Sequence, residues 1–308
     1  MPITIKPRTK STELSKLETL ARRLPARHPS APRINDDLAQ TRAGYHGEQS
    51  IEYYLHTAPA SAHLLHDLRL KGPHNYFQLD LLIITASTLH IIEIKNIAGT
   101  IHYDPRTGQA TRTLAGQTER IRNPLHQIKR QHAALSHWLS ARAHPQLPIH
   151  TTVIFTNPDT ILDTNCPAEF HQSEQLPELF QHYDPDTVPH TELSRDLAQS
   201  HKPLNRNLLE KYKIDRHALT RGVYCAHCES RLMQRQRYLW RCPSCAHTSR
   251  TAHHTALNEY ALLFGNTITN KQAREFLNIR SRTTARTLLR SMRLVHNGKQ
   301  SNRVYYLK

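Results

Sequence analysis

Apolar residues between positions 41 and 156 follow the pattern of an alternating α/β body. Two segments dense in Ile and Leu, residues 77–85 and 88–95, are separated by a short polar turn and predict neighbouring strands. Further strands are predicted over residues 63–70, 99–103 and 151–156. Apolar residues at helical spacing predict helices over residues 47–55 and 124–141. The second of these has a proline near its first turn, where proline is well tolerated.

The segments on either side of this body have weaker patterns. Residues 1–40 contain leucines at helical spacing after the cap candidates Ser11 and Thr12, and predict a helical extension without chemistry of its own. The leucines are Leu14, Leu17, Leu20 and Leu24. Residues 157–220 combine several prolines with short apolar pieces and predict an irregular linker. Short helices are expected there over residues 174–182 and 204–212.

Residues 251–308 predict three amphipathic helices followed by a hairpin. The first helix is expected over residues 256–264 and ends at Gly265. Thr269 and Gln272 have the spacing of a capping box for the second helix, and Ser281 can cap the third. Three helices and a basic hairpin resemble a winged helix-turn-helix, in which the third helix enters the major groove of DNA.

Charge divides the chain near residue 215. The 308 residues carry a net charge of +16. Residues 216–308 hold 17 Lys and Arg against 3 Asp and Glu, a net +14, whereas residues 1–215 hold 24 against 22, a net +2. This asymmetry indicates a polyanion-binding appendage on a nearly neutral body, since a generally basic proteome would make every domain basic.

The chain lacks the patterns of membrane and secreted proteins. Its apolar runs are far shorter than the ~18 residues of a membrane span. The polar first ten residues argue against a secretory signal. We therefore expect a cytoplasmic protein with no membrane partner.

Basic residues lie along one side of the third predicted C-terminal helix and on the hairpin. At about 100° per residue, the four arginines of the helix fall within an arc of roughly 80° beside its apolar stripe. The six candidate DNA-binding residues are Arg282, Arg286, Arg290, Arg293, Lys299 and Arg303. Duplex DNA is the expected partner, and RNA is the second choice. The alternative is a solvated face on a protein-binding module.

Four of the five cysteines occur as two Cys-x-x-Cys pairs. They are Cys225, Cys228, Cys242 and Cys245. In a cytosolic protein this spacing indicates metal binding rather than disulfides, and two such pairs can close a tetrahedron around Zn²⁺. Four protein ligands leave no open position, so the sequence predicts a structural zinc ribbon over residues 221–250. Unmetallated thiols or a redox pair are the alternative.

Charged side chains interrupt two of the most apolar strands. Glu93 and Lys95 alternate with Ile92 and Ile94, so the two charges face the same side of their strand. Asp80 begins the preceding strand, and a short hairpin would bring its carboxylate to the same end as Glu93. Two carboxylates suit a hard cation such as Mg²⁺ or Mn²⁺, and a nearby ammonium can orient water or neutralise phosphate charge. The alternative is an ordinary ion pair between Glu93 and Lys95, with Asp80 as a strand-end cap.

Four short motifs follow one another through the same body. They are Gly44-Tyr45-His46-Gly47-Glu48, Gln78-Leu79-Asp80, Glu93-Ile94-Lys95-Asn96 with Gly99, and Asn123-Pro124-Leu125-His126-Gln127. Together they resemble the nuclease-related domain (NERD), which is assigned to the PD-(D/E)xK nuclease superfamily. The resemblance covers residues 41–156 and implies that Asp80 and Glu93 bind Mg²⁺ or Mn²⁺ and that Lys95 is the catalytic lysine. It further implies that Glu48 is an acidic helper and that Gln127 orients substrate or water. Leu79 stands where the superfamily usually has proline.

These patterns predict an α/β fold with a PD-(D/E)xK-like nuclease core, a zinc ribbon and a small winged helix-turn-helix domain. The expected segments are an N-terminal helical extension (1–40), a nuclease-related domain (41–156), an irregular linker with short helices (157–220), a zinc ribbon (221–250) and a winged-helix-like DNA-binding module (251–308). The expected function is Mg²⁺- or Mn²⁺-dependent endonucleolytic hydrolysis of DNA, targeted by the basic C-terminal module. The alternative is a non-catalytic DNA-binding regulator that uses the nuclease-like fold as a scaffold. A third possibility is the same chemistry directed at RNA.

Overall fold

The computed structural model describes residues 1–181, 190–229, 231–299 and 302–307, which form two compact units. Unit 1 comprises Met1–Lys10 and Gln40–Leu204, and unit 2 comprises Ser11–Ala39 and Asn205–Lys308. Helix α2 (Ala31–Ser50) contributes residues to both. This division differs from the five expected segments, because residues 1–40 are shared between the units and residues 157–204 belong to unit 1.

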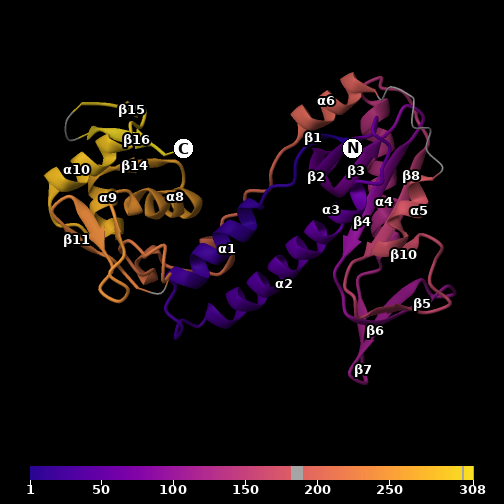
Figure 1. The fold of residues 1–308 in the computed structure, drawn as a ribbon, viewed down its shortest axis with the longest axis horizontal. Helices are drawn as coiled ribbons and strands as arrows, with labels where there is room; N and C mark the ends of the chain where they lie inside the picture. Colours follow the sequence, from indigo (N-terminus) through magenta and orange to yellow (C-terminus); the bar gives the residue numbers. More distant parts are fainter. Residues whose placement is uncertain (182–189, 230, 300–301, 308) are drawn as a thin grey trace. The chain divides into compact units, whose positions relative to one another are not determined.

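Unit 1 is built on a six-stranded mixed sheet with the order β1-β2-β3-β4-β8-β10 (Figure 1). The strands are β1 (Ile3–Lys6), β2 (His63–Lys71), β3 (Tyr76–Ile84), β4 (Leu89–Lys95), β8 (Ile149–Phe155) and β10 (Phe170–Gln172). Strand β3 pairs antiparallel with β2 and β4. The other three pairings, β1 with β2, β4 with β8 and β8 with β10, are parallel.

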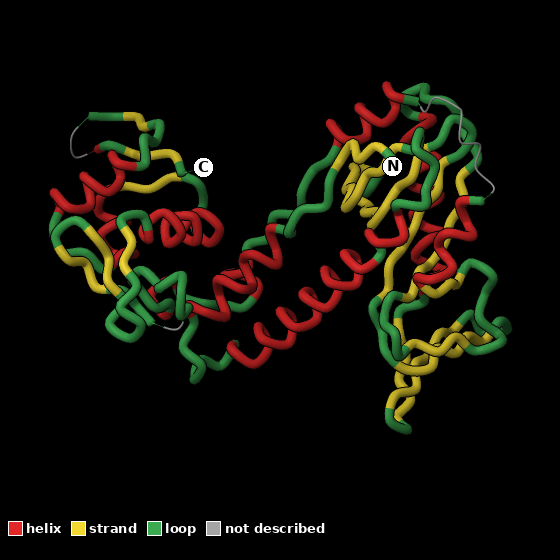
Figure 2. Tube along the Cα trace, viewed as in Figure 1, coloured by secondary structure: helices red, strands yellow, loops and turns green. Residues whose placement is uncertain are grey.

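Helices cover both faces of this sheet. On one face, Ile91 of β4 packs in a cluster with Trp138 of α4 (Pro124–Ser140) and with residues of α6 (Thr191–Ser200). On the other face, Ile92 packs in a cluster with Ile51, with Leu55 of α3 (Glu52–Leu55) and with α5 (Leu176–Phe180). Figure 2 shows these helices in red beside the yellow strands. Because β4 lies between two apolar layers, all of its residues except Lys95 are buried, and its charged residues stand out.

A second sheet of unit 1 has four strands in the order β7-β6-β5-β9. They are β5 (Gly99–Asp104), β6 (Gln109–Leu114), β7 (Gln117–Ile121) and β9 (Thr160–Leu162). Strands β5, β6 and β7 form two antiparallel hairpins, and β9 pairs parallel with β5. Buried Ile101 joins this sheet to the first through Phe155 and Phe170. A short 3₁₀ helix, η1 (Ser173–Gln175), leads into α5.

In unit 2, the four-cysteine segment and the C-terminal helices share an apolar core. Its helices are α1 (Thr12–Arg23), α7 (Leu208–Lys211), η2 (Arg216–Ala218), α8 (Ala252–Phe264), α9 (Asn270–Leu277) and α10 (Arg282–Ser291). One small sheet joins β11 (Gln234–Gln236), β12 (Leu239–Arg241) and β13 (Thr248–Ser249), and another has the order β14 (Thr267–Thr269), β16 (Val304–Tyr306), β15 (His296–Asn297). Trp240 and Cys225 lie in the same core as Leu257 of α8 and Leu289 of α10.

The structure confirms the predicted central strands, α4 and the three C-terminal helices, with ends shifted by a few residues. The capping box at Thr269 and the cap at Ser281 are also confirmed. The helix expected from residues 174 to 182 is observed as η1 and α5, and its predicted last residue, His182, lies outside the described residues. In the part of the chain that the structure describes, no helix has the length and apolarity needed to cross a membrane.

Three expectations about secondary structure were wrong. The helix predicted over residues 47–55 is observed as the end of α2, which begins at Ala31, followed by the separate helix α3. Strands β1, β6 and β7 were not predicted, because their residues are largely polar and half-buried or exposed. The segment 157–204, predicted as an irregular linker with short helices, also contains β9, β10 and α6. Strands of three residues are too short to give a periodic pattern.

Candidate active site

The candidate active site lies where strands β3 and β4 separate. Their backbone ladder ends at the pair Leu81–Ile92. Beyond this pair, Asp80 Oδ2 accepts a hydrogen bond of 2.9 Å from the backbone N–H of Ile94. The side chain of Asp80 thus takes the place of the next ladder bond and is held beside Glu93, as the hairpin pattern predicted.

Glu93 is buried, and three side chains hold its carboxylate. Lys95 Nζ donates to Oε1 at 2.6 Å, and the amide of Gln127 donates to the same oxygen. Gln131 Nε2 donates to Oε2 at 2.6 Å. Lys95 also donates to Gln127 Oε1 at 3.0 Å, so the charges and amides form one closed network. A carboxylate buried this deeply requires such partners.

Gln131 is a site residue that sequence reasoning missed. It follows Gln127 by four positions on α4, so both amides lie on the same helix face, and that spacing was the available signal. Its Nε2 also donates to the carbonyl oxygen of Gln78 at 2.9 Å, which ties α4 to β3 just before Asp80. Its Oε1 is buried and accepts no hydrogen bond from the described residues, so the network contains one unsatisfied acceptor.

Glu48 of α2 belongs to the same electrostatic cluster and is paired with Arg8. The side chain of Arg8 is only 4% exposed. It also donates to Glu52 Oε1 at 3.3 Å and lies 2.9 Å from Nδ1 of His66. The segment that follows β1 therefore brings a buried cation to the acidic residues. Sequence reasoning missed Arg8, because nothing in its local pattern connects it with a residue 40 positions away.

Burial and mutual repulsion raise the pKa values of two carboxyls. The pKa of Asp80 is well above its ordinary range because burial disfavours the charged form and because Glu93 and Glu48 add negative potential. Burial raises the pKa of Glu48 to about 7, against the opposing effect of Arg8. Burial and the charge of Arg8 lower the pKa of His66 to about 4, so this imidazole is neutral at neutral pH.

Asp80 and Glu93 are the residues of this cluster that could hold a divalent cation. Carboxylate oxygens are the ligands that Mg²⁺ and Mn²⁺ prefer, and two protein ligands leave positions for water and phosphate oxygens. Burial and the neighbouring carboxyls raise the pKa of Asp80, and a bound cation would relieve that repulsion. The donor set therefore fits such an ion.

Residues 43–156 match the family model of the nuclease-related domain. This chain contains a NERD domain. The match covers Glu48, Asp80, Glu93, Lys95 and Gln127, and it confirms the resemblance drawn from the four motifs. A NERD domain implies a nuclease-related function and a nucleic-acid substrate. No curated protein and no solved structure matched the chain.

Outside the NERD domain, the four paired cysteines of unit 2 form a second candidate site. All four sulfurs lie within 4.8 Å of one another, with Cys225 Sγ 3.7 Å from Cys245 Sγ and Cys228 Sγ 3.6 Å from Cys242 Sγ. In a tetrahedral site with Zn–S bonds of about 2.3 Å, the sulfurs are about 3.8 Å apart. The cluster predicted from the spacing is confirmed, and its geometry fits zinc.

The basic residues of the C-terminal region are mostly exposed. Arg282, Arg286 and Arg290 are exposed on α10 beside its buried residues Ala285 and Leu289, and Arg293 and Lys299 are exposed beyond the helix. Arg303 is half-buried. Strand β14 separates α8 from α9, and the pair β15–β16 follows α10. Contact between these six basic residues and DNA stays a prediction.

Proposed function

We propose that the chain is a divalent-cation-dependent nuclease that hydrolyses DNA phosphodiester bonds at a centre formed by Asp80, Glu93 and Lys95. The observation that carries this proposal is the placement of Lys95 Nζ 2.6 Å from Glu93 Oε1, beside Asp80 and within the NERD match. An acidic pair with an adjacent ammonium can hold a metal ion and stabilise phosphate charge, as metal-assisted phosphodiester hydrolysis needs.

The residues of the network have separate roles in this proposal. Asp80 and Glu93 would hold Mg²⁺ or Mn²⁺, which when bound supplies Lewis-acid stabilisation of the phosphate. Lys95 is 21% exposed, so its ammonium can reach a phosphate oxygen or the attacking water. Gln127 orients Lys95 through Oε1. Glu48, with a pKa of about 7, can exchange a proton near neutral pH.

A non-catalytic role is the second candidate, and one observation favours it. Both oxygens of Glu93 already accept hydrogen bonds, and Lys95 completes an ion pair with it. An acidic network satisfied in this way can serve as a structural element. The chain would then be a DNA-binding regulator with the NERD domain as its scaffold.

Cleavage assays with Asp80→Asn distinguish the two candidates. The full chain is incubated with and without Mg²⁺ or Mn²⁺ on supercoiled, linear, single-stranded and branched DNA and on RNA. The matched control is Asp159→Asn, which changes an exposed carboxylate of the same unit. Cation-dependent cleavage that is lost in Asp80→Asn and kept in Asp159→Asn supports the nuclease. Cleavage by neither the wild type nor the variants on any substrate supports the regulator.

We also propose that α8–β16 form a winged helix-turn-helix module that binds duplex DNA, and that zinc at the four cysteines stabilises it. The exposed arginines of α10 and the basic residues of the following hairpin support this proposal. In the full chain, Arg286→Ala with Arg290→Ala should reduce the dependence of log K on log salt by about 1.8, the loss of two phosphate contacts. Arg221→Ala with Arg250→Ala, at exposed positions of the same unit, is the control. Equal slopes in both double variants would argue for a solvated face.

A further inference from the structure

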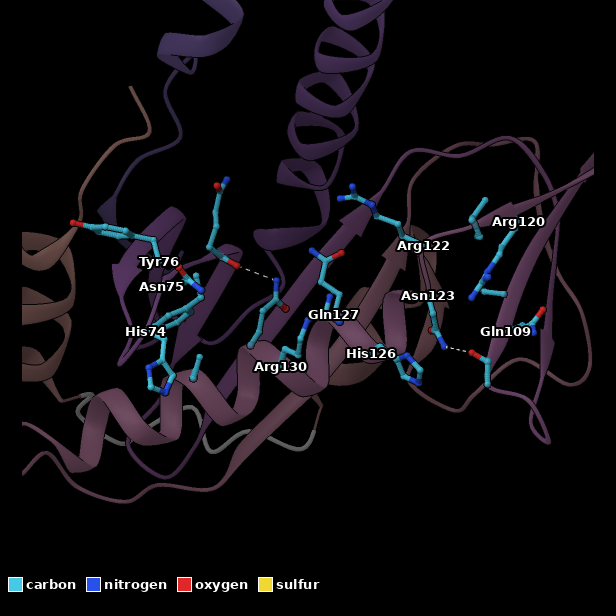
Figure 3. Close-up of a pocket in the computed structure, with 18 of the residues that line it drawn as sticks. His74, Asn75, Tyr76, Gln109, Arg120, Arg122, Asn123, His126, Gln127 and Arg130 are labelled. Carbon is cyan, nitrogen blue, oxygen red and sulfur yellow. Dashed lines mark hydrogen bonds between the residues drawn. The ribbon is translucent and has the colours of Figure 1, made fainter. Parts of the chain in front are cut away.

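A cleft of about 1140 Å³ opens on unit 1 beside the Glu93 network. Figure 3 shows His126, Gln127 and Arg130 on α4, Arg120 and Gln109 on the β6–β7 side, and the turn from His74 to Tyr76 at the other end. Gln127 and Gln131 both line the cleft. These two amides donate to Glu93, so residues that line the cleft are hydrogen-bonded directly to the candidate active site.

The lining of this cleft is cationic although the body of the chain is nearly neutral. It includes Arg120, Arg122 and Arg130 with two histidines, and none of the described residues that line it is Asp or Glu. The three arginines are exposed, and no acidic side chain in the described ranges pairs with them. On the adjacent strand, by contrast, Arg112 is paired with Glu119. Unpaired cations concentrated in one cleft attract a polyanion.

Hydrogen bonds hold two walls of the cleft together. Asn123 Oδ1 accepts from the backbone N–H of Leu125 at 2.9 Å and so caps α4. The amide nitrogen of the same side chain donates to the carbonyl oxygen of Gly108 at 2.6 Å, as the dashed line in Figure 3 shows. Gly108 has φ +65, which favours glycine. The β5–β6 turn is therefore fixed to the start of α4, and the arginines on either side keep their spacing.

We propose that this cleft binds the sugar-phosphate backbone of the nucleic-acid substrate next to the bond that is cut, with Arg120, Arg122 and Arg130 contacting phosphates. The inference rests on the proposed function for the identity of that bond. Arginine matches phosphate geometry with a planar, bidentate fork. Pockets for small ligands are typically about 300–1,000 Å³, and a larger cleft with cations from separate elements suits a polymer.

The test measures binding without catalysis. The full chain carries Asp80→Asn, divalent cations are absent, and the affinities for labelled single-stranded and duplex DNA are titrated against salt. Arg122→Ala with Arg130→Ala should reduce the slope of log K against log salt by about 1.4 for a single strand or about 1.8 for a duplex. The matched control, Arg106→Ala with Arg195→Ala, removes two exposed arginines that do not line this cleft. Thermal unfolding of each variant verifies that it is folded.

A crosslinking experiment locates the bound strand independently of affinity. Benzoylphenylalanine in place of Thr107, which lines the cleft, should crosslink to labelled DNA, and the same group in place of exposed Ser140 should not. Unchanged slopes in the cleft variant, equal losses in both double variants, or crosslinking from Ser140 alone would each overturn the inference. These results are independent of turnover. A wild-type chain that cleaves nothing therefore refutes the proposed nuclease, while the slopes and crosslinks still decide whether the cleft binds nucleic acid.

Discussion

Glu93 in unit 1 and Glu259 in unit 2 are both buried, and different kinds of partner stabilise the charges of their carboxylates. Glu259 is paired with both Arg22 and Arg23. Arg23 is fully buried, donates to the carbonyl oxygen of Thr220 at 2.9 Å and lies over the ring of Phe276 at 4.3 Å. Every charge at this site has an opposite partner. The site ties α1 to α8 within the core.

Among the described residues, Glu93 has one cationic partner, Lys95, and its other side-chain donors are neutral amides. Two further carboxyls, Asp80 and Glu48, add negative potential to the same place. A buried charge that is paired with opposite charges can serve as a structural connection. Carboxyls whose pKa values are raised by burial and by one another are more typical of sites that bind a cation or move a proton. The comparison therefore indicates a structural role for the Glu259 site and a functional role for the Glu93 site.

The largest expected effect is the loss of metal from unit 2. Cys225 and Cys242 lie in the apolar core of that unit, and binding of structural zinc can contribute about 10–16 kcal/mol to folding. Cys228→Ser should release zinc and unfold residues 221–250. The backbone amides around Glu93 should remain protected from hydrogen exchange. Elemental analysis and hydrogen exchange measure the two effects, and Cys166→Ser is the control. Reduced protein that is folded throughout without any zinc would contradict this prediction.

The next effect compares the two glutamate sites directly. Arg23→Ala leaves Glu259 buried with a single partner and should cost about 3–5 kcal/mol of unfolding free energy. Glu93→Gln keeps hydrogen-bonding capacity and removes one of several crowded charges, so its cost should be about 1 kcal/mol or less. Urea unfolding of the full chain measures both. Similar costs at the two sites would remove the distinction between them.

The sequence predicted the parts of these sites that depend on local periodicity. Glu93 and Lys95 were found because side chains alternate along a strand, and the cysteines because two short spacings define a metal knuckle. The partners of Arg8 and Arg23 were not predictable in this way. Arg8 pairs with Glu48, 40 positions away, and Arg23 pairs with Glu259, 236 positions away. Both pairs therefore depend on the tertiary fold and not on local sequence. Gln131 was predictable only in part. Its spacing from Gln127 predicts that both lie on one helix face, but not that Gln131 donates to buried Glu93.

Lys95→Ala should separate chemistry from stability within unit 1. Removal of one charge-stabilising donor typically lowers kcat by about 10²–10³-fold. The side chain of Lys95 is 21% exposed, and the amides of Gln127 and Gln131 still donate to Glu93 in its absence, so the variant should remain folded, which its urea unfolding curve verifies. Metal affinity, measured by calorimetry with Mn²⁺, should be retained, because Asp80 and Glu93 remain. A Lys95→Ala chain that cleaves DNA at the wild-type rate would refute the catalytic assignment.

The smallest expected effect is a change in the pH dependence of stability. The pKa of Glu48 is raised from 4.5 to about 7, so the folded chain binds this proton more tightly than the unfolded chain. The stability that this group contributes is fully present below the unfolded pKa of 4.5 and is lost as the pH rises through about 7. Glu48→Gln should therefore flatten the plot of unfolding free energy against pH in that window, by at most about 1.4 kcal/mol per pH unit.

Asp37 of unit 2 provides a control of opposite sign for this measurement. Hydrogen bonds from Lys211 and Tyr212 lower its pKa. The stability that Asp37 contributes is therefore present above its ordinary pKa and is lost as the pH falls through the lowered value. Asp37→Asn should therefore change the pH dependence of the unfolding free energy only at acid pH. Both variants are unfolded in urea with a chelator present, so that no divalent cation competes with protons. If Glu48→Gln left the slope of unfolding free energy against pH unchanged between pH 4.5 and 7, Glu48 would be ionised like an ordinary surface glutamate. The crowding that distinguishes the Glu93 site from the Glu259 site would then be limited to Asp80.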